Sequence, residues 1–196
     1  MAGPASRKPR ADAERNRAKV LEAARVLFAE RGDEVQLPEV ARAAGVGVGT
    51  VYRHFPTRQD LVEATAEHRF EQILDYAWTV CRDSVGRGDG VERYLRYVGK
   101  VLDDDRGLSA SIEAIRGAPG SAPKGRSREQ LEEAVGVLIE QGRTAGTLRD
   151  DLTVSDVYML VGCVSTAIRA GSGDWRRLVD LALDGVRPRP AAPTGR

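Results

Sequence analysis

The stretch VARAAGVGVGTVYRHF, residues 40–55, constrains the fold of this chain more than any other part of the sequence. It places Gly45, Gly47 and Gly49 at alternate positions inside an otherwise helical pattern. Gly45 can take the left-handed conformation that a tight turn between two helices needs, which β-branched residues adopt only at a cost. The stretch therefore predicts two short helices with a tight turn between them, which is typical of a helix-turn-helix.

The two short helices are predicted at 38–44 and 48–54, and Pro56 ends the second. Isolated helices below about 12 to 15 residues are marginal in water, and each glycine costs about 1 kcal/mol against alanine. Packing must therefore hold them. The apolar positions of the stretch supply this packing, and a longer helix over 14–31 offers the matching face with Leu27 and Phe28.

Helical periodicity continues along the rest of the chain. Thr57, followed three residues later by Asp60, resembles a capping box and predicts the start of a long helix. No segment alternates with period two for long enough to predict a strand. The expected fold is all-α, with about nine helices at 14–31, 38–44, 48–54, 57–83, 90–104, 106–116, 126–145, 154–170 and 174–185.

Composition and charge divide the chain unevenly. The net charge is +1, but the first 60 residues hold 11 basic and 8 acidic side chains. A basic segment of this kind suits contact with a polyanion, although a solvated charged tail explains the same count. The predicted organisation is a disordered basic arm, a helix-turn-helix domain, a larger helical domain and a disordered tail, at 1–12, 13–56, 57–186 and 187–196.

Several classes of function find no support in the sequence. Cys81 and Cys163 have no paired spacing that indicates a zinc site or a disulfide framework. No apolar run approaches the ~18 residues that span a bilayer, so a cytoplasmic protein without membrane contact is expected. There is no nucleophile motif or paired carboxylates in an apolar setting, so neither an enzyme nor a cofactor is expected. Residues 103–105 read as a solvated helix end, and GVGVG lacks the preceding strand of a dinucleotide-binding loop.

The second short helix presents a distinctive set of outward residues. Hydroxyl groups, arginine and imidazole donate hydrogen bonds to phosphate oxygens, and threonine or valine methyl groups can meet a thymine methyl. Tyr52 could instead lie partly in the core, and Val48 could belong to turn packing. The outward set is Val48, Thr50, Tyr52, Arg53 and His54.

The segments AARVLFAERG, VARAAGVGVGTVYRHF and PTRQDLVEA, within residues 15–64, resemble the TetR family of bacterial transcriptional regulators. The resemblance implies a three-helix DNA-binding domain joined to a larger helical ligand-binding and dimerisation domain. Arg58 stands where the family usually has a phosphate-binding lysine, and Gln36 stands where it often has threonine. The resemblance implies that the recognition helix lies in the major groove, and the candidate DNA-contacting residues are Gln36, Val48, Gly49, Thr50, Tyr52, Arg53, His54 and Arg58.

In this family the larger domain encloses an effector pocket and carries the dimer interface. Candidate pocket residues, which could equally fill the core, are His68, Tyr76, Trp78, Cys81, Tyr94, Tyr97, Ile112 and Arg116. The last two predicted helices could form a four-helix interface with a second copy, or be buried within a monomer. Candidate interface residues are Val157, Leu160, Val161, Val164, Ile168, Leu178 and Leu181.

The expected function is that of a dimeric repressor that binds a palindromic operator in double-stranded DNA and is released by a small-molecule effector. An activator, or a regulator that responds to a protein partner, fits the same residues. A helical small-molecule-binding protein with a vestigial helix-turn-helix is a further alternative.

Overall fold

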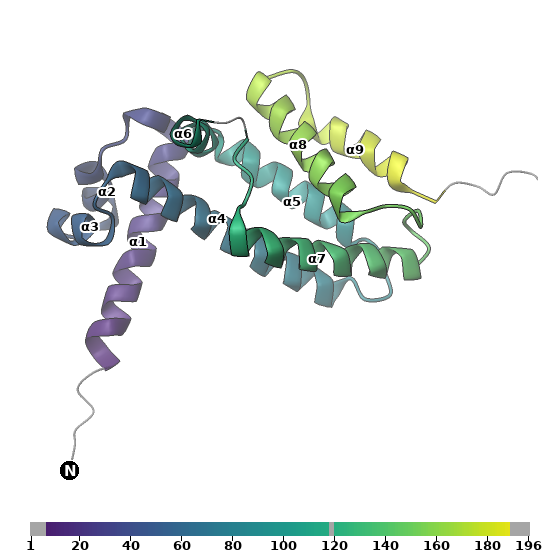
Figure 1. Cartoon of the computed structure of the whole chain (residues 1–196), viewed down its shortest axis with the longest axis horizontal. Helices are drawn as coiled ribbons and strands as arrows, with labels where there is room; N and C mark the ends of the chain where they lie inside the picture. The colour runs from purple at the N-terminus through teal and green to yellow at the C-terminus, as the bar shows by residue number, and fades with distance from the viewer. Residues whose placement is uncertain (1–6, 118–119, 189–196) are drawn as a thin grey trace, which may run out of the picture. The chain divides into compact units, whose positions relative to one another are not determined.

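A computed structural model describes residues 7–117 and 120–188 of the chain (Figure 1). These residues contain no strand, which confirms the predicted all-α class. Most helix ends fall within one or two residues of the predicted ends. The elements are α1 Arg7–Arg31, the 3-10 turn η1 Gly32–Glu34, α2 Leu37–Ala44, α3 Val48–His54, α4 Arg58–Asp83, α5 Gly90–Asp104, α6 Arg106–Arg116, α7 Gly125–Thr144, α8 Val154–Ala170 and α9 Trp175–Val186.

The largest departure from the predicted elements is the start of α1. The helix begins at Arg7, whereas the sequence predicts it from residue 14. Part of the predicted disordered arm is therefore helical. Residues 1–6 of that arm and 189–196 of the predicted tail lie outside the described residues.

The chain divides into two compact units. Unit 1 comprises Met1–Arg69 and Asp105–Ser121, and unit 2 comprises Phe70–Asp104 and Ala122–Arg196. The boundary predicted near residue 56 differs from this division, because α4 as far as Arg69 and the whole of α6 belong to unit 1. The helix-turn-helix is thus built into a larger helical unit than the sequence indicates.

The core of unit 1 is organised around one face of α1. Val20, Leu21, Ala24 and Phe28 are buried along this face at helical spacing, and Leu27, which the sequence also assigns to it, is half-buried. α6 packs closely against α1 at Gly107. A Cβ atom added to Gly107 would lie 2.1 Å from the carbonyl oxygen of Phe28. Only glycine fits at this contact.

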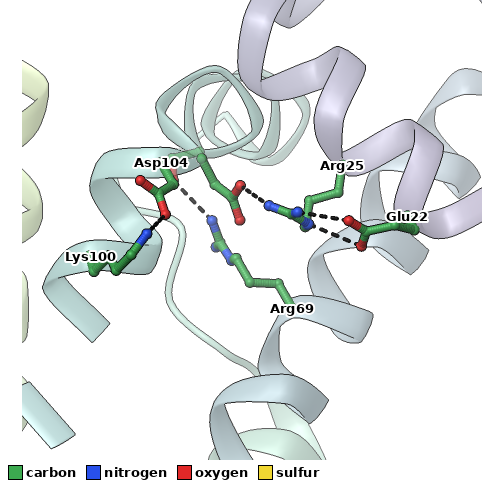
Figure 2. A network of polar contacts seen from close by, with 7 residues as sticks. Glu22, Arg25, Arg69, Lys100 and Asp104 are labelled. Carbon is green, nitrogen blue, oxygen red and sulfur yellow. Dashed lines mark hydrogen bonds and ion pairs between the residues drawn. The ribbon is translucent and has the colours of Figure 1, made fainter. Parts of the chain in front are cut away.

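A polar cluster that is partly buried accompanies the apolar core of unit 1. Arg25 on α1 contacts Glu22 at 2.8 Å and donates a 2.8 Å hydrogen bond to Asp105 (Figure 2). Arg69 on α4 is 1% exposed and donates to the Ser109 hydroxyl at 3.0 Å and the Ser121 carbonyl oxygen at 3.1 Å. These hydrogen bonds connect α1, α4, α6 and the segment after α6 within unit 1.

Unit 2 contains the remainder of α4 with α5, α7, α8 and α9. Gly99 on α5 admits the Trp175 ring of α9, and the Trp175 indole donates to Asp103 at 2.9 Å. A capping box of Thr153 and Asp156 begins α8. None of the described helices is both long enough and apolar enough to cross a bilayer.

Candidate nucleic-acid interface

The turn between α2 and α3 depends on Gly45. Gly45 has φ 66° and ψ 33°, the left-handed conformation that the sequence predicts. Its N–H donates to the Arg42 carbonyl at 3.2 Å, and the Val46 N–H donates to the Ala41 carbonyl at 3.0 Å. These two hydrogen bonds form a Schellman motif and satisfy carbonyl groups at the end of α2.

The other two glycines of the stretch have a different status. Gly47 has φ −65° at the start of α3, which any residue can adopt. A Cβ atom on Gly49 would meet no neighbouring atom within 4 Å. The fold therefore requires glycine at position 45 but not at position 49.

The start of α2 is fixed by Glu39 rather than by a hydroxyl group. The Gln36 N–H donates to the Glu39 carboxylate at 3.0 Å, and Arg31 holds this carboxylate with bonds of 2.9 and 3.3 Å. Gln36 itself is exposed. Its contact with DNA stays a prediction.

The short helix α3 has one buried side and one exposed side. Val51 and Phe55 are buried, at 0% and 3% exposure, and hold the helix in unit 1. Val48 and Tyr52 are 42% and 48% exposed, so neither is a core residue. Gly49, Arg53 and His54 are also exposed, and Thr50 is half-buried. Six of the eight candidate DNA-contacting residues thus lie on one short helix, and most of their side chains are available to a partner.

Arg53 folds back over its own helix. Its Nε donates a 3.1 Å hydrogen bond to the Gly49 carbonyl, and its guanidinium lies 3.5 Å from the Thr50 hydroxyl. The guanidinium thus covers the first turn of α3. Reaching a phosphate requires Arg53 to exchange these surface contacts, which is inexpensive for an exposed side chain.

Arg58 lies at the start of α4 with several partners inside unit 1. The predicted capping box is present, since the Asp60 N–H donates to Thr57 Oγ1 at 3.1 Å and the Thr57 N–H donates to Asp60 at 2.9 Å. The Arg58 guanidinium donates to Asp33 at 2.9 Å and lies 5.3 Å from the centre of the Phe28 ring. It also donates to the Gly32 and Val35 carbonyls at 3.3 and 3.4 Å. Its predicted phosphate contact stays a prediction, and sequence reasoning missed this bracing role.

Residues 20–65 match the model of the bacterial regulatory proteins of the tetR family, and residues 88–188 match the SbtR-like transcriptional regulator C-terminal domain. A crystal structure of a TetR regulatory protein from Mycobacterium vanbaalenii is 36% identical, with a TM-score of 0.69, over 91% of this chain and 98% of that one. The chain belongs to the TetR family.

Two further relatives agree with this membership. A TetR transcriptional regulator from Streptomyces coelicolor is 30% identical, with a TM-score of 0.70, over 89% of this chain and 99% of that one. An HTH-type transcriptional regulator from Staphylococcus aureus (strain USA300) is 29% identical over 106 residues, 54% of this chain. The match spans 57% of the length of this curated relative.

The predicted effector residues of this TetR-family chain fall into both units. His68, Ile112 and Arg116 lie in unit 1, where Arg116 holds Glu63 with bonds of 3.1 and 2.8 Å. The others lie in unit 2, and two of them stack with ring centres 3.8 Å apart, Tyr76 and Tyr97. The unit 2 candidates are Tyr76, Trp78, Cys81, Tyr94 and Tyr97.

Two tyrosine side chains in unit 2, Tyr94 and Tyr158, are removed from solvent to a large extent. The Tyr158 hydroxyl, which the sequence reasoning missed, is buried without a hydrogen-bond partner among the described residues. Burial raises the pKa of Tyr158 to about 12, and it raises the pKa of Tyr94 as well. Both phenols are therefore neutral hydrogen-bond donors at ordinary pH.

The predicted dimer residues separate into buried and surface positions. Val157, Val164 and Ile168 are 1%, 3% and 4% exposed, so they pack inside unit 2 and have almost no surface to bury against a second copy. Leu160, Val161 and Leu178 are half-buried, and Leu181 is 53% exposed. Met159, which the sequence reasoning missed, is 60% exposed on α8. A groove of about 480 Å³ lies beside these residues, lined by Arg149, Asp151, Leu152, Asp156, Met159, Leu160, Ala182, Gly185 and Val186.

Proposed function

We propose that this TetR-family protein is a transcriptional repressor that binds a palindromic operator as a homodimer and is released by a small-molecule effector. The observation that carries the proposal is the exposed side of α3, which lies opposite the buried Val51 and Phe55. A helix held on one side and exposed on the other can enter the major groove without rearrangement of its support.

The chemistry of this side favours DNA. Tyr52, Arg53 and His54 donate hydrogen bonds to phosphate oxygens, while the methyl groups of Val48 and Thr50 suit the methyl group of thymine. The open space at Gly49 allows the helix backbone to approach the DNA closely. Together these residues supply both positioning contacts and base contacts.

Dimerisation is needed for useful specificity. The seven residues of α3 span about 10 Å and reach only a few base pairs. Two copies related by a twofold axis read a palindrome with half-sites about one helical turn of DNA apart, or a multiple of it. The exposed Met159 and Leu181 on α8 and α9 supply an apolar surface for the second copy.

The effector site proposed here lies within unit 2. The stacked rings of Tyr76 and Tyr97 offer an aromatic surface to a small molecule, and the Tyr158 hydroxyl, buried without a hydrogen-bond partner among the described residues, offers a donor to a hydrogen-bond acceptor. An effector that binds one conformation of unit 2 better than another would shift the population away from the DNA-binding form. The chain passes between the units at residues 69–70, 104–105 and 121–122, which provides covalent routes for this shift.

The test begins with selection of duplexes from random DNA by the purified protein. Enrichment of a palindrome supports the proposal, and the absence of any enriched palindrome contradicts it. Tyr52→Ala should weaken binding to the selected duplex at least tenfold, because it removes an exposed DNA-facing side chain. Val26→Ala is a control at a 42% exposed position of α1 and should leave binding unchanged.

A further inference from the structure

The N-terminal half of α1 extends beyond the core of unit 1. The helix begins at Arg7, but Val20 is the first buried side chain among those described, which start at residue 12. At about 1.5 Å per residue, residues 7–19 span about 20 Å. The described side chains of 12–19 are all exposed or half-buried. This segment, which we call the α1 extension, contributes little to the apolar core and extends past α2 and α3 (Figure 1).

The α1 extension is strongly basic. Its sequence RKPRADAERNRAK holds six arginine and lysine residues against Asp12 and Glu14. A basic helix of this length is complementary to a polyanion, and DNA carries one negative charge about every 1.7 Å along its axis. The side of the extension that faces DNA can therefore meet phosphates along its length, whereas a basic residue on the opposite side cannot.

Arg17 connects the α1 extension to the recognition helix. Its guanidinium carbon lies 5.8 Å from the centre of the Phe55 ring, at the C-terminal end of α3. The ring of exposed His54 lies 6.1 Å from the same Phe55 ring. Arg17 is itself exposed. The Phe55 ring can orient its guanidinium through a cation–π contact, while the N–H groups that point to solvent donate hydrogen bonds to a phosphate.

We propose that Arg17 binds a phosphate of the DNA backbone beside the groove entered by α3, and that the α1 extension continues the DNA-binding surface along that backbone. The inference rests on the proposed function and adds to it a second DNA-binding element. Arg17 and His54 both lie next to the Phe55 ring, so the new surface adjoins that of α3.

Lys19 provides a matched control. Lys19 is exposed on the same helix. It follows Arg17 by two residues, so its side chain is rotated about 200° around the helix axis from that of Arg17. Arg17 shares the side of α1 that carries Leu21 and Phe28, whereas Lys19 lies on the opposite side. Arg17→Gln and Lys19→Gln therefore remove the same charge from opposite sides of one helix.

The test measures the salt dependence of binding to a duplex recovered by selection. Each phosphate contact contributes about −0.9 to the slope of log K against log salt concentration. With two copies of Arg17 in a dimer, Arg17→Gln should reduce the magnitude of the slope by about 1.8. Lys19→Gln should leave the slope close to that of the wild-type protein, and Arg17→Lys should preserve most of it. A wild-type slope for Arg17→Gln would overturn the proposal.

Hydrogen exchange of the wild-type protein gives a second measurement that needs no variant. Amides of residues 12–19 should exchange more slowly when the selected duplex is added, because DNA contact stabilises the extension. Unchanged exchange at these amides would also overturn the inference. If the wild-type protein selects no duplex at all, the proposed function itself fails. If it binds a duplex but the exchange at residues 12–19 is unchanged, only the further inference fails.

Discussion

The Asp105 carboxylate, 1% exposed, accepts a 2.8 Å hydrogen bond from the Arg25 guanidinium. Asp105 also favours the charged form of fully buried Arg69, so a single carboxylate balances two arginines inside unit 1. Replacement of this carboxylate by an amide removes the buried negative charge that acts on both arginines, and Arg25 keeps the half-exposed Glu22 as a partner. Such a change is costly because a buried charge loses its partner without regaining water.

Asp105→Asn should therefore lower the free energy of unfolding by about 2 to 3 kcal/mol, below the upper range for buried pairs because the Arg25 side chain is 26% exposed. Urea unfolding followed by circular dichroism measures the change. Asp104→Asn is the control, because Asp104 pairs with Lys100 at 51% exposure (Figure 2) and should cost less than about 1 kcal/mol. Equal losses in the two variants would contradict the role assigned to Asp105.

The lowered pKa of Asp33 predicts that unit 1 loses stability in acid. A hydrogen bond from the Ser111 hydroxyl, aided by Arg58, lowers the pKa of Asp33 below its ordinary value of 3.8. Because the folded pKa is lower than the unfolded pKa, the stabilisation is complete above pH 3.8 and is lost as the pH falls through the folded value. Acid should therefore loosen the contacts between η1, α4 and α6.

Carboxyl NMR titration measures this response directly. The midpoint of Asp33 should lie below 3.8 in the wild-type protein and move toward 3.8 in Ser111→Ala. Ser172→Ala, an exposed change in unit 2, should leave the midpoint unmoved. A wild-type midpoint at or above 3.8 would show that neither Ser111 nor Arg58 stabilises the carboxylate.

The sequence predicts those parts of the molecule that depend on neighbours along the chain. Gly45, Pro56 and the Thr57–Asp60 pair act within a few residues, so the helix-turn-helix and the start of α4 follow from the sequence. The bond between Arg25 and Asp105 joins residues 80 positions apart, and no local pattern contains it. The α1 extension has no apolar stripe, which is why the predicted helix starts too late.

The helical periodicity of the sequence also does not reveal whether an apolar stripe is covered by the same chain or by a second copy. The stripe of α8 correctly predicts a helix, but Val157, Val164 and Ile168 are covered by unit 2 itself. The exposed positions Met159 and Leu181 become distinguishable only when the packing of α8 and α9 is known. For the same reason the sequence does not reveal that Arg58 braces unit 1 through Asp33.

The two glycines at 45 and 49 should respond in opposite ways to alanine. Gly45→Ala forces a side chain into the left-handed region and should lower the free energy of unfolding by about 1 to 2 kcal/mol. Gly49→Ala meets open space within a helix and should raise stability by up to about 1 kcal/mol. It should nevertheless weaken DNA binding, because the methyl group occupies the surface that faces the groove.

Urea unfolding and fluorescence anisotropy with a selected duplex, applied to both variants, separate these effects. If Gly49→Ala is more stable but binds DNA more weakly, glycine at this position serves DNA contact and not the stability of the fold. Wild-type affinity in Gly49→Ala would contradict close approach of the α3 backbone to DNA at this position.

The exposed apolar surface of α8 and α9 gives the last prediction. Met159→Glu or Leu181→Glu should convert a dimer into a monomer, because burying an unpaired carboxylate in an apolar interface costs several kcal/mol. Light scattering coupled to gel filtration measures the mass. Val85→Glu is the control, since Val85 is 69% exposed in the segment after α4 and should leave the dimer intact. A wild-type monomer would refute dimerisation, whereas a dimeric Met159→Glu protein would refute only this surface as the interface.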